Sequence, residues 1–195
     1  KLVSIGKTIL LPMGLYSNQY KDLATVPNGA SVAIPNDPTN GGRALLLLQQ
    51  AGLIQLKDGG SPKSTVADIT SNPKNLQIKE LEAAQIARSL NDVDIALVNT
   101  NYALNAGLNP LKDAVVVESK DSPYANVFVV RQGDENNETI KKLLAVYQSD
   151  ATKKFVEDTF KGPLFRHSSR LKKTFFTFCV KVLFLLLKYV YNKII

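Results

Sequence analysis

An apolar segment that runs directly into a helix start is the feature that most constrains this fold. Residues 32–35 are apolar, a turn rich in Pro, Asn and Gly follows, and a run of strong helix formers begins at Ala44. This order predicts a strand over residues 31–35 and a helix over about residues 40–51 that ends at Gly52. A strand followed at once by a helix is the repeating unit of α/β folds.

The same turn predicts a binding site for a carboxylate. The first turn of a helix has backbone N–H groups without intrahelical partners and carries the positive end of the helix dipole. Arg43 lies in this turn and adds a planar set of donors that matches a carboxylate. The alternative is an ordinary connection with a surface arginine, and these residues alone leave both interpretations open.

The net charge of +7 comes from one end of the chain. Residues 163–195 hold seven Lys or Arg and no Asp or Glu. Without these seven, 17 of the 24 basic residues remain, and they balance the 17 acidic ones. A neutral body offers no basic face to a nucleic acid, so we expect no nucleic-acid partner.

Cysteine and histidine are too scarce for several kinds of site. The single Cys179 and the single His167 both lie in residues 163–195. One chain therefore cannot form a disulfide or a Cys/His metal site, and its body cannot use Cys or His for catalysis. The sequence also lacks a P-loop, a dinucleotide fingerprint and a G-x-S-x-G motif. We expect no enzyme activity, no catalytic residue, no metal and no cofactor.

Strand and helix patterns alternate along the rest of the chain. Residues 2–16 read as an extended apolar segment, and residues 65–70 as a short helical turn. Further strands are predicted at residues 75–80, 94–98, 113–118 and 126–131, and further helices at residues 82–90, 135–148 and 150–160. This order predicts an α/β fold with a largely parallel sheet.

Three polar clusters follow predicted strands, at residues 36–43, 99–102 and 124–126. In open α/β sheets, ligands bind outside the carboxyl ends of the strands. Neutral amides beside an arginine and a helix start suit a zwitterion better than a phosphate. Asparagines are also ordinary turn residues, so the clusters alone do not decide between a site and plain turns.

Several runs of this sequence resemble the NlpA lipoprotein family, the methionine-binding proteins of bacterial ABC importers. The resemblance covers residues 1–162 and is carried by residues 34–40 (IPNDPTN), 42–49 (GRALLLLQ), 51–54 (AGLI), 65–69 (TVADI), 72–76 (NPKNL) and 121–126 (DSPYAN). It implies a type II periplasmic-binding-protein fold, in which an amino acid is held between two lobes.

The resemblance also implies roles for individual residues. Arg43 matches the arginine that pairs with the carboxylate of the ligand, and Asn99 and Asn126 match asparagines that bind its amino-acid end. Asn36 and Asn40 are expected to line the pocket, with the alternative that Asn40 is only the N-cap of the helix. The implied ligand is L-methionine or a related amino acid. The implied setting is a monomeric lipoprotein in the periplasm or on the outer face of the cell membrane, which serves the permease of an ABC importer.

The sequence departs from the family pattern at both ends. Family members carry a signal sequence, a lipid-modified cysteine and most of the first lobe before the position of Lys1. We therefore expect lobe 2, residues 16–115, to be complete, and lobe 1 to be partial, with residues 1–15 and 116–162. Binding by this chain is expected to be weak or absent. A degenerate member without a ligand, and a receptor for another amino acid or a dipeptide, remain alternatives.

Residues 163–195 form a basic, hydrophobic tail that we interpret as translation out of frame. Within it, residues 174–190 are strongly apolar but contain Lys181 and Lys188. This segment is short for a bilayer, which needs about 20 apolar residues. It is apolar almost all round, so we expect an aggregation-prone or non-functional helix rather than one that binds a membrane surface.

Overall fold

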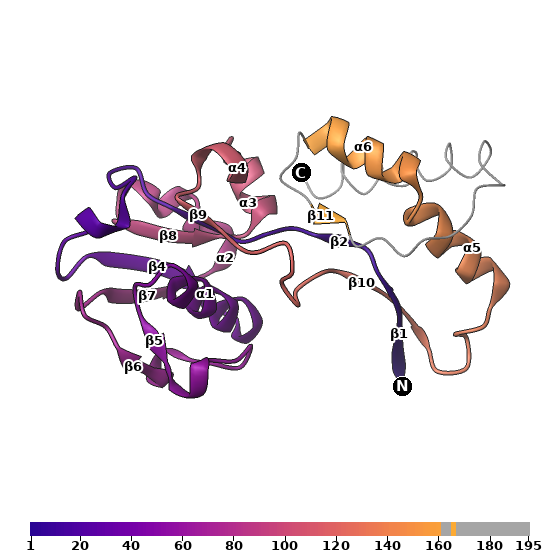
Figure 1. Cartoon of the computed structure of the whole chain (residues 1–195), viewed down its shortest axis with the longest axis horizontal. Coiled ribbons are helices and arrows are strands. Elements are labelled where there is room, and N and C mark those ends of the chain that lie inside the picture. The colour runs from indigo at the N-terminus through magenta and orange to yellow at the C-terminus, as the bar shows by residue number, and fades with distance from the viewer. Residues whose placement is uncertain (161–164, 167–195) are drawn as a thin grey trace. The chain divides into compact units, whose positions relative to one another are not determined.

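The structure is a computed structural model that describes residues 1–160 and 165–166. The chain divides into two compact units (Figure 1). Unit 2 is Pro12–Ser119, and unit 1 combines Lys1–Leu11 with the chain from Lys120 onward. The expected second lobe, residues 16–115, falls inside unit 2.

Unit 2 is built on a five-stranded sheet. Its order is β7 (Gln77–Leu81), β4 (Ser31–Pro35), β8 (Ile95–Val98), β3 (Gly14–Tyr16) and β9 (Val116–Val117). β4 runs parallel to β7 and β8, whereas β3 runs antiparallel to β8 and β9. Parallel neighbours need a crossover connection, and α1 (Pro38–Gln50) supplies it between β4 and β7. The expected largely parallel sheet is therefore a mixed one.

Helices cover both faces of this sheet because its central strands are apolar on both sides. Val32 and Ile34 of β4 belong to one buried cluster, which includes Leu45 and Leu48 of α1. Ala33 of β4 belongs to the opposite cluster. That cluster also includes residues of α2 (Ala83–Ile86) and α3 (Thr100–Asn105). Consecutive strand residues point to opposite faces, so one strand contributes to both cores.

The shorter elements of unit 2 depart most from expectation. The helix expected at residues 82–90 splits into α2 and a 3-10 turn, Arg88–Asn91. The turn at residues 65–70 becomes a 3-10 turn followed by β6 (Ile69–Ser71), which pairs with β5 (Gln55–Leu56). The remaining short elements are α4 (Pro110–Asp113) and 3-10 turns at Leu23–Thr25, Lys57–Gly59 and Val66–Asp68. Gly52 follows the end of α1 with φ of 74°, which confirms the expected stop signal.

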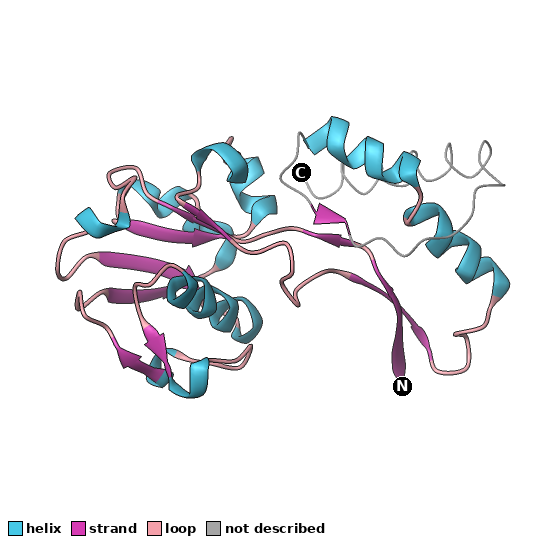
Figure 2. Cartoon of the chain, in the orientation of Figure 1, coloured by secondary structure: helices cyan, strands magenta, loops and turns pink. Residues whose placement is uncertain are grey.

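In the described part of unit 1, the chain forms two small strand pairs and two helices (Figure 2). β1 (Leu2–Lys7) pairs antiparallel with β10 (Val127–Arg131). β2 (Ile9–Leu10) pairs antiparallel with β11 (Phe165–Arg166). The helices are α5 (Glu138–Tyr147) and α6 (Asp150–Phe160), close to the expected ranges. An edge-to-face contact between Phe128 and Tyr147, with ring centroids 5.3 Å apart, joins α5 to β10.

No helix within residues 1–160 or 165–166 is both long enough and apolar enough to cross a membrane. The apolar segment at residues 174–190 lies outside the described residues, as does most of the expected tail. The tail residues in β11 pair with β2, in register Phe165 with Leu10.

Candidate functional site

The helix start that the sequence singled out is built by Asp37 and Pro38. Asp37 is the N-cap of α1, and its Oδ1 accepts a hydrogen bond from the backbone N of Asn40 at 2.9 Å. Pro38 occupies the first helical position, where its fixed φ suits the helix and its missing N–H costs nothing. The helix therefore begins two residues before the expected position. The alternative that Asn40 is the N-cap is wrong.

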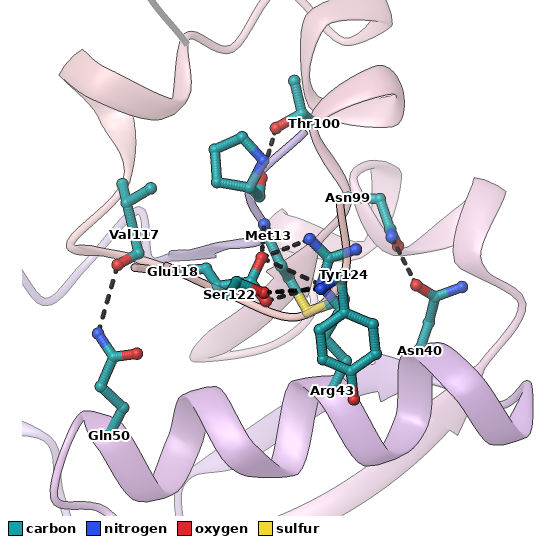
Figure 3. Close-up of polar contacts among 11 residues, drawn as sticks. Met13, Asn40, Arg43, Gln50, Asn99, Thr100, Val117, Glu118, Ser122 and Tyr124 are labelled. Atoms are coloured by element: carbon teal, nitrogen blue, oxygen red, sulfur yellow. Dashed lines mark hydrogen bonds and ion pairs between the residues drawn. The ribbon is translucent and has the colours of Figure 1, made fainter. Parts of the chain in front are cut away.

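Arg43 is buried in an ion pair with Glu118. Its side chain leaves α1, only 8% of the residue is exposed, and the alternative of a surface arginine is therefore wrong. Nε lies 3.0 Å from Oε1 and 3.1 Å from Oε2 of Glu118, and Nη2 also donates to Oε2 (Figure 3). Both partners are equally buried, so each supplies the counter-charge that makes burial of the other tolerable.

Glu118 also fixes the chain segment that enters unit 2. The backbone N of Met13 donates to its Oε2 at 2.9 Å, and the backbone N of Glu118 donates to the Met13 carbonyl at 2.9 Å. The Glu118 carboxylate is thereby held from two directions, by α1 and by the residue before β3. Glu118 was not among the site residues predicted from the sequence. The available signal was an acid directly after the three valines of residues 115–117, because a carboxylate beside a buried strand needs a partner.

Asn40 and Asn99 are joined beside this ion pair. Asn40 and Arg43 are three residues apart, and Figure 3 shows both side chains on the same side of α1. Asn99 follows β8, and its Nδ2 donates to Oδ1 of Asn40 at 2.8 Å. Thr100, the next residue, donates through Oγ1 to the carbonyl of Pro12 and so fixes the start of α3. The structure thus brings three of the five predicted site residues together.

The side-chain oxygen of Asn99 is a buried acceptor with no donor. Among the residues that the structure describes, Oδ1 of Asn99 has no hydrogen-bond partner. Asn99 is the N-cap of α3, yet its side chain makes no capping hydrogen bond. A buried unsatisfied polar atom costs about 1–3 kcal/mol, so native proteins pair such atoms with protein, water or ligand. This oxygen can therefore accept a hydrogen bond from water or from a bound molecule.

The other two predicted residues are not brought to this group by any described contact. Asn36 is exposed and lines a cavity of about 210 Å³ together with Lys63 and Glu80. The lining of that cavity includes none of Arg43, Asn40 and Asn99. Asn126 belongs to unit 1, where its backbone N donates to the Ile9 carbonyl at 2.9 Å and its side chain is exposed. The expected ligand contacts of both residues stay predictions.

The chemistry of the site is that of binding. Within residues 1–160 and 165–166, no three His, Cys, Asp or Glu side chains are grouped so as to hold a metal. Arg43, Glu118, Asn40 and Asn99 contribute charge and hydrogen bonds, and none of these side chains is a nucleophile of the activated kind that covalent catalysis uses. Such a set can recognise a small polar molecule.

Comparison with known proteins gives consistent relatives. The profile of the NlpA lipoprotein family matches residues 1–167. The chain is 52% identical over 164 residues to the D-methionine-binding lipoprotein MetQ of Salmonella typhi, covering 83% of this chain and 60% of that protein. It is 49% identical over 164 residues, with the same coverage, to Lipoprotein 28 of Escherichia coli K12. The chain thus spans about 60% of the length of these curated relatives.

Solved structures of similar fold support the same assignment. A periplasmic substrate-binding protein of an ABC transporter from Coxiella burnetii superposes with a TM-score of 0.80 at 48% identity, covering 86% of this chain and 70% of that one. A nutrient binding protein from Burkholderia cenocepacia, bound to methionine, gives 0.79 at 50% identity, with coverage of 85% and 70%.

These matches settle the fold and the family. The expected α/β fold of a periplasmic binding protein is confirmed, and the family that matches is, as expected, one of substrate-binding proteins and not of enzymes. The family match also reaches five residues beyond Gly162, where the resemblance was expected to end. The chain belongs to the NlpA lipoprotein family.

Proposed function

We propose that this chain is a substrate-binding component of a bacterial ABC importer and that its ligand is L-methionine. The proposal is carried by the buried Oδ1 of Asn99, which has no partner among the described residues, together with the buried guanidinium of Arg43 (Figure 3). A free amino acid carries an ammonium donor and a carboxylate acceptor on one carbon. Its two charged groups complement an acceptor and a cation that lie on the same side of α1.

The two ends of the ligand would be recognised separately. The ligand carboxylate would bind the guanidinium of Arg43, and the ammonium would donate to Oδ1 of Asn99. A hydrogen bond to a charged group contributes about 1.5–3 kcal/mol, or about one to two factors of ten in affinity. The relatives from Salmonella typhi and Burkholderia cenocepacia, named for or bound to methionine, favour that side chain over others.

The wider setting follows from the family. We propose that the mature protein is a lipoprotein on the outer face of the cytoplasmic membrane and delivers its ligand to the permease of an importer. Asn126 and Asn36 are proposed to contact the ligand through their exposed side-chain amides.

An NMR titration tests the proposal at the weak affinity that we expect. L-Methionine is added to the chain labelled with nitrogen-15, up to about 10 mM, a concentration that detects millimolar affinity. The side-chain amide of Asn99 and the Nε–H of Arg43 should shift in a saturable way. Unmoved resonances at both positions would refute the proposal. A larger response to another amino acid or to a dipeptide would change the ligand but keep the site.

Variants that test the role of Arg43 must not leave its buried partner, Glu118, as an unpaired charge. Arg43→Ala alone leaves the Glu118 carboxylate buried without a counter-charge, and breaking such a pair costs about 3–5 kcal/mol. The double variant Arg43→Met with Glu118→Gln removes both charges together, should fold, and should lose at least about tenfold in affinity. Arg131→Met, which removes an exposed arginine, is the matched control and should bind as the parent does.

A further inference from the structure

We propose that Asp37 and Asn40 are positioning residues that make the site select a ligand with a hydrogen-bond donor. The two residues fix which end of the Asn99 amide meets the ligand. This inference rests on the proposed function and adds to it the reason for preferring an amino acid over the acid that lacks the amino group.

The hydrogen bonds that run from Asp37 through Asn40 to Asn99 form what we call the relay. The relay begins at the carboxylate of Asp37. An ionised carboxylate only accepts hydrogen bonds. Nδ2 of Asn40 lies 3.2 Å from Oδ1 and 3.0 Å from Oδ2 of Asp37, and the backbone N of Asn40 bonds the same Oδ1. The amide nitrogen of Asn40 must therefore face Asp37, since its oxygen there would meet only acceptors.

The fixed sense passes from Asn40 to Asn99. With its nitrogen on Asp37, Asn40 presents Oδ1 to Asn99, and Nδ2 of Asn99 donates to it at 2.8 Å (Figure 3). A flip of the Asn99 amide would place two oxygens opposite each other. The remaining atom of that amide is Oδ1, which is buried and has no partner among the described residues.

The relay ends at Oδ1 of Asn99, which we infer accepts a hydrogen bond from the ligand. An asparagine at an N-cap commonly uses its side-chain oxygen to cap its own helix. Asn99 occupies that position in α3 and forgoes the bond. Because Asp37 fixes the orientation of both amides, the site presents a hydrogen-bond acceptor, Oδ1 of Asn99, to the ligand. A ligand without a hydrogen-bond donor would leave this acceptor unpaired.

Two ligands measure this preference. L-Methionine carries an ammonium donor, whereas 4-(methylthio)butanoate is the same acid without it. The chain should bind L-methionine about tenfold or more tightly, as expected for a hydrogen bond to a charged donor. In Asp37→Asn, the new amide still caps α1 but can either donate or accept. L-Methionine should then lose about tenfold in affinity, the deaminated acid should change little, and the ratio should fall toward one.

A reversed relay distinguishes polarity from simple structural support. The double variant Asp37→Asn with Asn99→Asp moves the carboxylate from position 37 to position 99, next to the ligand. Nδ2 of Asn40 can then donate to the carboxylate at position 99, and Oδ1 of Asn40 can accept from the new amide at position 37. The double variant should restore the preference for L-methionine. Asp22→Asn changes another capping aspartate, which accepts from Ala24, and should leave the ratio unchanged.

The relay also has a readout that needs no ligand. The side-chain amides of Asn40 and Asn99 should each give one set of NMR signals in the parent and broadened or doubled signals in Asp37→Asn. Unchanged signals and an unchanged ligand ratio in that variant would overturn the relay, as would a double variant that stays unselective. If L-methionine binds in none of these proteins while the amide signals respond as expected, the relay stands and the proposed ligand fails.

Discussion

At the residue scale, two buried polar side chains of unit 2 differ in whether their polar groups have a hydrogen-bond partner. The buried guanidinium of Arg43 donates from two of its nitrogens to the carboxylate of Glu118. Tyr16 is 2% exposed, and its hydroxyl has no hydrogen-bond partner among the described residues. Burial, and to a smaller extent the negative charge of Asp113, raise the pKa of the Tyr16 hydroxyl well above its ordinary value of 10.0.

This pKa shift predicts a loss of stability in alkali. The hydroxyl keeps its proton more firmly in the folded than in the unfolded state, so its contribution is fully present below pH 10 and declines as the pH rises above that value. Tyr16→Phe should remove this decline. It should also be neutral or slightly stabilising near neutral pH, because no hydrogen bond is lost.

Urea unfolding at about pH 8 and about pH 11 measures the effect. The stability difference between Tyr16→Phe and the parent should grow in favour of the variant as the pH rises. Tyr20→Phe, the same change at a partly exposed tyrosine, is the control. Parallel pH dependence of the parent and Tyr16→Phe would contradict the prediction.

At the scale of the element, α1 is pressed closely against a loop of unit 2. A Cβ added to Gly42 would lie 2.5 Å from the carbonyl oxygen of Pro62 and 3.2 Å from that of Ser64. Both are backbone atoms, which cannot move aside as the end of a flexible side chain can. The glycine pair at residues 41–42 therefore lets the first turn of α1, with Asn40 and Arg43, pack at its observed distance from this loop.

Gly42→Ala should consequently destabilise the protein. In an open helix the same change would stabilise by about 1 kcal/mol through helix propensity. Here overpacking should outweigh that gain, with a net loss of about 1–3 kcal/mol. Thermal unfolding by circular dichroism measures it, with Thr39→Ala, an exposed position of the same helix, as the control. A Gly42→Ala variant at least as stable as the parent would show that the loop yields.

At the scale of the whole molecule, the two units differ in the extent of their buried hydrophobic core. Unit 2 has a five-stranded sheet with apolar clusters on both faces. In unit 1, β1 and β10 form a two-stranded pair that leaves Leu2, Val127 and Val129 between 44% and 71% exposed. An isolated two-stranded pair is marginally stable in water, and local opening follows the density of buried contacts.

Hydrogen exchange should separate the units. Backbone amides of β4 and β8 should exchange much more slowly than those of β1 and β10, because the former lie in a sheet that is covered on both faces. Exchange followed by mass spectrometry, with the denatured chain as reference for intrinsic rates, gives the comparison. Equal protection of the four strands would mean that both units open together.

Local signals explain how much the sequence could predict. The strand at residues 31–35, the stop at Gly52 and the two helices of unit 1 follow from periodicity and caps, which act within a few residues. The helix expected at residues 82–90 broke into two pieces, and the sheet proved mixed, because strand partners and packing lie far apart in sequence. Arg43, Asn40 and Asn99 were predicted as site residues from residue type at strand ends and from family resemblance, and their ligand contacts stay predictions.

The sequence by itself determined the α/β class, the family and the helix start that carries Arg43, since each depends on neighbouring residues or on recognisable runs. Only the tertiary structure revealed that Glu118, 75 residues from Arg43, is its partner, and that Asp37 sets the sense of two asparagines. Hydrogen-bond direction depends on which atoms the fold places opposite each other. A linear sequence names the donors and acceptors, and the folded chain pairs them.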